Sequence, residues 1–388
     1  MRTPFKRQLS ILLAADSFKG AASSAEIEDY LEVGILRAFP DARIRKVPIA
    51  DGGEGTLDAF IAQGGGRRET IYVENPFGKR IAARFGVLSD DSAVIEMAEA
   101  AGIGFSDRSC EAALRASTYG VGQLLHAVLE QGIRRVYIGL GGSATIDGGA
   151  GLAEALGIQL LDSHGKTVPR GLQGLREVVS VDKSLLDQRL QESEIIALSD
   201  VDTPLTGTCG AVYVFGPQKG LLDARLCEFD AWMQRYANVV FADTGYDASL
   251  VAGAGAAGGL GFGLLSFCGA TITSGVEALL DRVHFNELLR ETDLVITGEG
   301  RMDNQTAHGK APVGIARRAA LQGVPTYAVV GSCTEDLSEV HRAGIQRVFA
   351  SAPSDLSLEE CMRRTSEDVA AAAERAVRFF IQDQQSFK

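Results

Sequence analysis

Two closely spaced carboxylates stand where an apolar run gives way to a polar loop. Asp200 and Asp202 lie in Leu-Ser-Asp-Val-Asp-Thr-Pro (198–204), and alternation along an extended stretch places both side chains on one side. Two carboxylates on one side either hold a cation or raise one another's pKa toward general-base chemistry. Surface carboxylates before a turn are the alternative interpretation.

A second acidic set surrounds an arginine. Glu299, Arg301 and Asp303 follow the apolar run 294–297, and Lys310 comes soon after. The planar arginine fork suits a carboxylate or a phosphate. An internal ion pair at Arg301 and a solvated Lys310 are the competing readings.

The N-terminal region repeats this arrangement. Asp16, Ser17 and Lys19 follow the apolar run 9–15 and precede a helix start at Ser23, which suits binding of a phosphate or a substrate carboxylate. A turn with a locally bonded aspartate is the alternative.

A further pair of carboxylates lies among glycines. Asp51 and Glu54 occur in Asp-Gly-Gly-Glu-Gly (51–55), where bare backbone leaves access to both side chains. A simple helix cap would also explain them.

Glycine is the over-represented residue, at 45 of 388 positions, against a usual share of about 7%. Residues 139–151 are a glycine-rich cluster between the predicted strand 135–138 and a helix at Leu152. The cluster fits the dinucleotide pattern G-x-G-x-x-A, and Asp162 follows at the expected spacing. This supports an alternative function, an NAD-dependent dehydrogenase of a small hydroxy acid. Residues 253–258 repeat G-x-G-x-x-G without a leading strand.

A Walker A sequence is missing. Gly165-Lys166-Thr167 has Leu160 where glycine is required, and Gly309-Lys310 is followed by Ala311. A P-loop ATPase is therefore not indicated. Phosphates can still bind to other glycine backbone N–H groups.

Alternating strand and helix patterns must position these groups. Five strands are expected near residues 9–15, 43–50, 293–297, 326–331 and 347–351, with the last helix starting near Ser357. This order predicts a doubly wound parallel sheet, which binds ligands outside the carboxyl ends of its strands. The polar motifs fall at those ends.

The middle of the chain has a different pattern of predicted elements, with paired strands expected near residues 69–74, 79–88 and 92–97. We expect one domain from residues 1–75 together with 285–388. An inserted mixed α/β domain would cover 76–284, with the active site in the cleft between the two.

Composition narrows the classes of partner. The net charge of −12 argues against nucleic acid, and no signal peptide is indicated. The uncharged residues 248–276 are interpreted as a glycine-rich loop and buried helix rather than a membrane span. Six scattered cysteines without a CxxC pair predict reduced, buried thiols and a cytoplasmic location. A homodimer is compatible with the sequence.

Seven strings resemble, in order from Asp16 to Ala352, the signatures of the bacterial glycerate kinase type 1 family. They are Asp-Ser-Phe-Lys-Gly (16–20), Ala-Asp-Gly-Gly-Glu-Gly-Thr (50–56), Gly-Leu-Gly-Gly-Ser-Ala-Thr (139–145), Asp-Val-Asp-Thr-Pro-Leu-Thr-Gly (200–207), Val-Phe-Gly-Pro-Gln-Lys-Gly (214–220), Gly-Ala-Gly-Ala-Ala-Gly-Gly-Leu-Gly (253–261) and Ile-Thr-Gly-Glu-Gly-Arg (296–301). The departures from the family pattern are Ile146, Thr203, Cys209 and Asn304. Ile146 replaces the usual Asn beside Asp147, which affects details of that loop.

The resemblance implies a flavodoxin-like doubly wound domain built from both chain ends, with an inserted mixed α/β domain. It implies transfer of a phosphoryl group from ATP with Mg²⁺ to D-glycerate, chiefly at the 2-hydroxyl and less at the 3-hydroxyl, in glyoxylate and related acid metabolism.

Roles can be expected for the residues quoted. Lys19 and Arg301 would hold the glycerate carboxylate or the γ-phosphate, and Asp200 and Asp202 would bind Mg²⁺ or activate the hydroxyl. The substrate pocket would be completed by Asp16, Ser17, Asp51, Glu54, Glu299 and Asp303. The nucleotide phosphates would be held by Gly141, Gly142, Ser143, Thr145, Lys219, Gly255, Gly258 and Lys310.

Overall fold

The computed structural model describes residues 8–50, 52–307, 310–353 and 356–386. The chain divides into two compact units, a terminal unit of residues 1–51 and 276–388 and an inserted unit of residues 52–275. This division differs from the predicted boundaries at 75/76 and 284/285. The reason at the first boundary is that β3 (Gly66–Glu74) pairs along its whole length with β4 (Arg80–Leu88). The location of the active site in a cleft stays a prediction.

The terminal unit contains a parallel sheet in the order β15-β13-β11-β1-β2. Its strands are β1 (Ser10–Ala15), β2 (Arg43–Lys46), β11 (Leu294–Gly298), β13 (Thr326–Val330) and β15 (Ile345–Ala350). Numbered within this unit, the order is 2-1-3-4-5, that of flavodoxin-like folds. The doubly wound sheet is thus confirmed, and the strand order reverses between β1 and β11.

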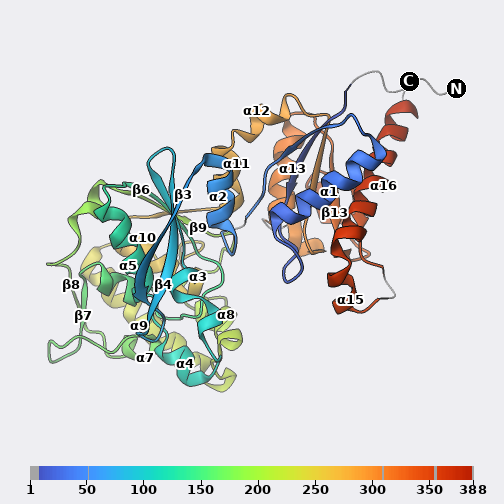
Figure 1. Cartoon of the computed structure of the whole chain (residues 1–388). Helices are drawn as coiled ribbons and strands as arrows, with labels where there is room; N and C mark the ends of the chain where they lie inside the picture. The colour runs from blue at the N-terminus through green and yellow to red at the C-terminus, as the bar shows by residue number, and fades with distance from the viewer. Residues whose placement is uncertain (1–7, 51, 308–309, 354–355, 387–388) are drawn as a thin grey trace. The chain divides into compact units, whose positions relative to one another are not determined.

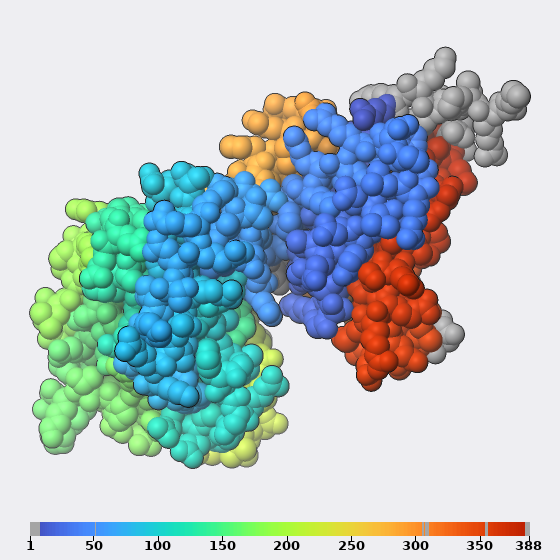
Figure 2. Space-filling model, in the orientation of Figure 1, coloured from blue at the N-terminus to red at the C-terminus, as the bar shows by residue number. Residues whose placement is uncertain are grey.

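Helices cover both faces of this sheet because its central strands β1, β11 and β13 are apolar on both sides. Tyr327 and Val329 of β13 pack in the core with α1 (Ser24–Ala38) and α16 (Thr365–Ser386), which lie side by side (Figure 1). Ala328 and Val330 instead pack with α13 (Ala311–Leu321). In Figure 2 the blue N-terminal segment and the red C-terminal segment adjoin within this unit.

Shorter elements complete the terminal unit. They are α11 (Gly275–Arg282), α12 (Phe285–Leu289), β12 (Arg301–Met302), the 3-10 turn η4 (Asn304–Ala307), β14 (Ser332–Cys333), α14 (Ser338–Arg342) and α15 (Leu358–Arg363). The predicted capping box of α1 is present, since Ser23 and Glu26 bond reciprocally. A helix does start next to Ser357, which forms a second capping box, but it is the short α15, and the last helix starts at Thr365.

The inserted unit contains a mixed sheet in the order β10-β9-β6-β5-β4-β3. β5 (Ser92–Glu96), β6 (Arg135–Gly139), β9 (Glu194–Leu198) and β10 (Thr271–Thr273) run parallel, while β4 is antiparallel to β3 and β5. A separate antiparallel pair is formed by β7 (Gln159–Leu161) and β8 (Ser180–Asp182). The paired strands predicted around residues 69–97 are confirmed.

Most helices of this unit pack around one large apolar core, and α2 (Thr56–Gly64) instead packs on β3, β4 and β5. The other helices are α3 (Ala98–Ala101), α4 (Cys110–Arg115), α5 (Tyr119–Glu130), α6 (Ala150–Ala155), α7 (Leu172–Leu175), α8 (Ala211–Lys219), α9 (Leu226–Thr244) and α10 (Ala256–Cys268), with 3-10 turns at Ile103–Phe105, Gln188–Glu192 and Asp223–Arg225. α10 is the buried helix expected within residues 248–276. Among the described residues, no helix combines the length and apolarity that crossing a bilayer requires.

The cysteine prediction holds only in part. All six cysteines are free, but Cys209, Cys227 and Cys333 are exposed and only Cys268 is fully buried. Spacing along the chain carries no information on burial, so this part of the prediction was wrong.

Close contact between α1 and α16 depends on Gly34. A methyl group there would lie 2.0 Å from the Ala370 carbonyl oxygen, so Gly34→Ala should destabilise the terminal unit by about 1–3 kcal/mol. The measurement is the melting temperature. Gly314→Ala is the matched control, because a methyl group at this α13 glycine meets at 3.2 Å only the flexible end of Glu277. Equal melting temperatures for the two variants would contradict the prediction.

Candidate functional site

The first polar group lies at the point in the terminal unit where the strand order reverses. Asp16 follows β1 and Glu299 follows β11, and the Asp16 N–H donates to the Gly298 carbonyl at 2.9 Å. Asp16 and Ser17 are half-buried, whereas Lys19 is exposed. The sheet therefore brings the 16–19 and 299–303 motifs, distant in sequence, to neighbouring strand ends.

Glu299 is the buried member of this group. Thr306 donates its hydroxyl to the Glu299 carboxylate at 2.7 Å, and the Lys310 ammonium donates at 3.3 Å. Burial raises the pKa of Glu299, and these two donors oppose the rise. Arg301 is exposed and Asp303 half-buried, so this edge presents groups of both charges.

Thr306 was missed in the sequence analysis. Its buried hydroxyl also accepts the Asp303 N–H at 3.2 Å, which is a local hydroxyl turn. The signal in the sequence is a hydroxyl residue three positions after an aspartate, a common pattern that does not by itself indicate a site.

Hydrogen bonds from the start of α1 fix the strand end at which this first polar group lies. Ser24 donates its hydroxyl to the Ala15 carbonyl at 2.6 Å and accepts the Ile49 N–H at 2.8 Å. Glu28 accepts the Ala15 N–H at 3.4 Å, and its burial raises its pKa well above the usual value. The chain entering residues 50–56 is thereby tied to β1. Asp51 itself lies outside the described residues.

The second polar group lies at the carboxyl ends of β5, β6 and β9 in the inserted unit. The Leu140 N–H donates to the Leu198 carbonyl at 3.1 Å, and the Gly141 N–H donates to the Gly52 carbonyl at 3.0 Å. A Cβ atom at Gly141 would lie 2.3 Å from the Gly53 α-carbon, so glycine is required by the close approach of two chains. Glu54 and Gly142 are exposed on these loops.

The two glycine-rich clusters pack against each other. The Gly148 N–H donates to the Gly258 carbonyl at 3.1 Å, and a Cβ atom at Gly258 would lie 1.9 Å from the Thr145 carbonyl oxygen. A Cβ atom at Gly255 would lie 2.2 Å from the Pro204 carbonyl oxygen. Chain packing accounts for both glycines, and a role of either in phosphate binding stays a prediction.

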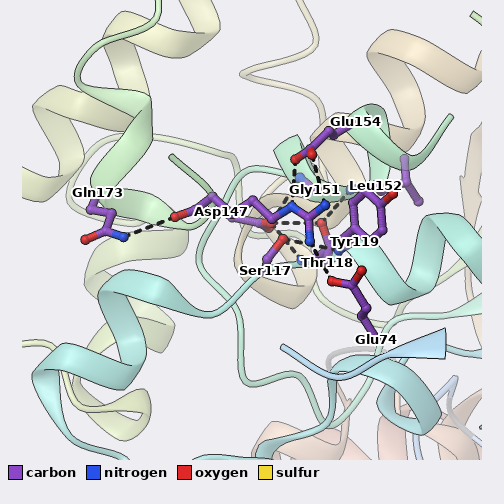
Figure 3. A network of polar contacts seen from close by, with 10 residues as sticks. Glu74, Ser117, Thr118, Tyr119, Asp147, Gly151, Leu152, Glu154 and Gln173 are labelled. Atoms are coloured by element: carbon purple, nitrogen blue, oxygen red, sulfur yellow. Dashed lines mark hydrogen bonds and ion pairs between the residues drawn. The ribbon is translucent and has the colours of Figure 1, made fainter. Parts of the chain in front are cut away.

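Asp147 is a fully buried carboxylate that fixes the loop of residues 139–151. It accepts the N–H and the hydroxyl of Thr118 at 2.8 and 2.9 Å, and the N–H groups of Gly149 and Gly151 at 3.2 Å each. Thr118 in turn accepts the Leu152 N–H at 2.9 Å. The starts of α5 and α6 are therefore capped by one another's polar groups (Figure 3). Burial raises the pKa of Asp147, and these hydrogen bonds oppose the rise.

An arginine also links the elements around the starts of α5 and α6. The Arg170 guanidinium donates twice to Glu154 at 2.9 Å and once to Glu74 at 2.7 Å. Its central carbon lies 3.5 Å from the centre of the Tyr119 ring. The guanidinium therefore joins α5, α6 and the end of β3.

Lys219 reaches the same loop from the end of α8. Its ammonium donates to the Ser143 hydroxyl at 2.5 Å and to the Thr145 carbonyl at 2.8 Å. The residue is only 3% exposed. Burial lowers the pKa of Lys219 to about 7, against the opposing effect of Asp147.

Glu96 is a second residue that sequence analysis missed. It ends β5, is buried, and accepts the Leu57 N–H at 2.8 Å, near the start of α2. Burial raises the pKa of Glu96 to about 7, and the negative charges of Glu99 and Asp58 add to the rise. The available signal was a carboxylate at the end of a predicted strand, the same signal used for the other motifs.

The two carboxylates of the first motif differ in environment. Asp200 is half-buried and Asp202 is exposed beyond the end of β9. No cluster of three His, Cys, Asp or Glu side chains suited to a metal ion occurs within the described residues. A dedicated all-protein metal cage is therefore not seen in that part of the chain.

The structural premise of the dehydrogenase alternative is contradicted. Asp162 accepts the N–H groups of His164 and Lys166 at 2.8 and 2.9 Å, which closes a tight turn. The preceding strand β7 pairs antiparallel with β8 and belongs to a separate sheet from β6. A dinucleotide fold requires a parallel βαβ unit at this place.

This chain has relatives among known protein families and proteins, and those described next carry the same name. The family described as "Glycerate kinase family" matches residues 11–381. A glycerate kinase of Halalkalibacterium halodurans is 41% identical over 356 residues, covering 92% of this chain and 94% of the relative. The glycerate 2-kinase of Escherichia coli is 39% identical over 366 residues, covering 94% of this chain and 96% of the relative.

A solved structure agrees with these relatives. The crystal structure of a candidate glycerate kinase 2 from Salmonella typhimurium LT2 superposes with a TM-score of 0.85 at 38% identity. The alignment covers 98% of this chain and all of that chain. The fold of both units is therefore shared with that protein.

The raised pKa of Glu96 predicts a pH-dependent cost. Above pH 4.5 the unfolded chain ionises this carboxyl while the folded chain keeps it protonated up to about pH 7, so folding stability is lost as pH rises through that window. Glu96→Gln should therefore gain stability relative to the wild type between pH 5 and 7, by at most about 1.4 kcal/mol per pH unit. Urea unfolding at several pH values measures the difference. Glu111→Gln, on exposed α4, controls for loss of one charge, and parallel curves for wild type and Glu96→Gln would contradict the expectation.

Proposed function

Because the chain belongs to the glycerate kinase family, we propose that it transfers the γ-phosphoryl group of ATP to the 2-hydroxyl of D-glycerate, with Mg²⁺. The observation that carries the proposal is the gathering of charged groups and glycine loops at the carboxyl ends of parallel strands, in both units. Such strand ends are where open α/β sheets bind their ligands. The relative from Escherichia coli that is 39% identical bears the name glycerate 2-kinase, which favours the 2-hydroxyl.

Phosphoryl transfer needs positioning and neutralisation of charge more than covalent participation by the protein. In the terminal unit, Lys19 and Arg301 are exposed cations beside the half-buried Asp16 and Ser17. We assign to the two cations the binding of the glycerate carboxylate or the γ-phosphate. Asp16, Ser17, Glu299 and Asp303 then accept or donate hydrogen bonds to the glycerate hydroxyls.

In the inserted unit, we assign phosphate binding to the backbone at the exposed Gly142 and to the Ser143 hydroxyl, because the N–H groups of Gly141 and Ala144 already donate to the Gly52 and Ala101 carbonyls. Gly142 is exposed and has a left-handed φ of 75°, a conformation that favours glycine. The chain is thereby turned so that a ligand can approach the bare backbone.

The donor set fits a magnesium ion. Mg²⁺ prefers oxygen ligands and is commonly held by one or two carboxylates together with substrate phosphates. Asp200 and Asp202 are two carboxylates of this kind at one strand end, and they would hold the ion. When bound, Mg²⁺ neutralises charge on the phosphates.

The attacking hydroxyl also needs a proton acceptor. Asp200 is half-buried, and a carboxylate at the edge of the interior can both orient a hydroxyl and accept its proton. We therefore assign Asp200 to the glycerate hydroxyl as well as to the ion, and leave Asp202 to the ion.

The product tests the regiochemistry directly. With ATP, Mg²⁺ and D-glycerate, a coupled assay should detect ADP release, and proton-coupled phosphorus NMR should give a doublet. The 2-phosphate has one proton on the carbon that bears it, whereas the 3-phosphate has two and would give a triplet. A triplet would overturn the 2-hydroxyl assignment, and absence of ADP release would overturn the proposed reaction.

Replacement of the assigned base should separate chemistry from folding. Asp200→Asn is expected to lower kcat by about 10²–10⁴-fold with an unchanged melting profile. Asp223→Asn, an exposed aspartate of the same unit, is the matched control and should keep wild-type turnover. Near-normal kcat for Asp200→Asn would remove this residue from the mechanism.

A further inference from the structure

Lys219 occupies an unusual position for a lysine in a phosphate-binding protein. Its ammonium is 2.5 Å from the Ser143 hydroxyl and 2.8 Å from the Thr145 carbonyl, and the residue is 3% exposed. The side chain is therefore directed into the protein beneath the loop of residues 141–145. Ser143 is 8% exposed and is followed outward by its exposed neighbour Gly142.

The protonation state of Lys219 decides in which direction the Ser143 hydroxyl donates its hydrogen. An ammonium group has three donors and no acceptor, whereas a hydroxyl has one donor and two acceptor positions. When Lys219 is charged, Ser143 must accept from it, and the serine hydrogen remains for another acceptor. When Lys219 is neutral, the amine lone pair can accept that hydrogen and turn it inward.

We propose that Lys219 is a positioning residue whose charged amine holds the Ser143 hydroxyl so that its hydrogen is donated outward to an anionic oxygen of the bound substrates. The proposal rests on the proposed function, because that function supplies the phosphate and carboxylate oxygens. Lys219 is thus assigned to the orientation of the loop rather than to direct contact with phosphate.

The surroundings explain why the contact responds to pH. Asp147, buried in the same loop, is the charge that favours the ammonium form, while burial favours the neutral amine. From α9 the Tyr236 hydroxyl approaches the Gly148 carbonyl at 3.5 Å, and burial holds the pKa of that phenol well above its usual range. On α8 itself the Phe215 ring is 5.7 Å from the amine. Burial lowers the pKa of Lys219 to about 7, so the charge of this amine changes near neutrality.

The charge of Lys219 also sets the direction in which kcat/KM changes with pH. The active form carries the proton, so kcat/KM should fall as pH rises through the pKa of Lys219, about 7 in the free enzyme. An anion bound at Ser143 favours the charged amine, so the corresponding decline in kcat should occur at higher pH than the decline in kcat/KM.

A double-mutant cycle between Lys219→Met and Ser143→Ala tests the coupling. Each single variant should lower kcat/KM about 10- to 100-fold, the range of one hydrogen bond to a charged group. The double variant should lose no more than the more damaged single variant, and both singles should lack the decline around pH 7. Losses that multiply, or a decline that persists in Ser143→Ala, would overturn the proposal.

Two controls keep the test decisive. Lys183→Met removes a half-exposed lysine paired with Asp243 in the same unit, and should keep the wild-type profile. Should Lys219→Met fail to fold, Ser143→Ala alone still tests the pH dependence, because it leaves the lysine in place.

Ligand binding separates this proposal from the proposed reaction. Calorimetric titration of wild type with ADP alone and with D-glycerate alone, at pH 6 and 8.5, needs no turnover. One of the two ligands should lose affinity at pH 8.5 in the wild type but not in Ser143→Ala, and that ligand is the partner of Ser143. A wild type that binds without turnover overturns only the reaction, whereas pH dependence identical in both proteins overturns the role of Lys219.

Discussion

The burial of one carboxylate, Asp147, is the constraint on which the inserted unit depends. A buried charge is tolerated only when hydrogen bonds replace its lost water, and here four donors do so. Those donors come from the beginnings of α5 and α6, so the same bonds that stabilise the charge also fix where both helices start. The glycine-rich loop between β6 and α6 is thereby fixed at its α6 end, while the bonds of Leu140 and Gly141 to the Leu198 and Gly52 carbonyls fix its β6 end.

The sequence predicted those features that local patterns determine. Apolar runs followed by polar loops indicated β1, β11 and β6 correctly, because a parallel strand buried on both faces must be almost wholly apolar. Asp16 and Glu299 could be grouped from the order of strands and motifs along the chain, since the carboxyl ends of parallel strands meet at one edge of a sheet. The seven ordered strings then identified the family.

Burial and pairing between distant segments could not be predicted in this way. Gly258 was expected in a phosphate-binding loop because it lies in a string that resembles the family, although the Thr145 carbonyl lies where its side chain would be. Lys219 was expected among the phosphate ligands because it lies in a string that resembles the family, and only the packing of α8 reveals its buried partners. Glu96 carried the same strand-end signal as Asp200, but its cap on α2 is a contact across 39 residues.

The interior position of β1, between β11 and β2, also constrains how the protein is made. Ile11 pairs on one side with Ile44 and on the other with Leu294, so one edge of this apolar strand has no partner until roughly 280 further residues have been synthesised. At about 5–20 residues per second that interval is tens of seconds. The inserted unit is continuous and can complete its own core during the interval, while the nascent N-terminal segment exposes an open strand edge of the kind that aggregates. A chaperone that shields this segment would therefore act before the last third of the chain emerges.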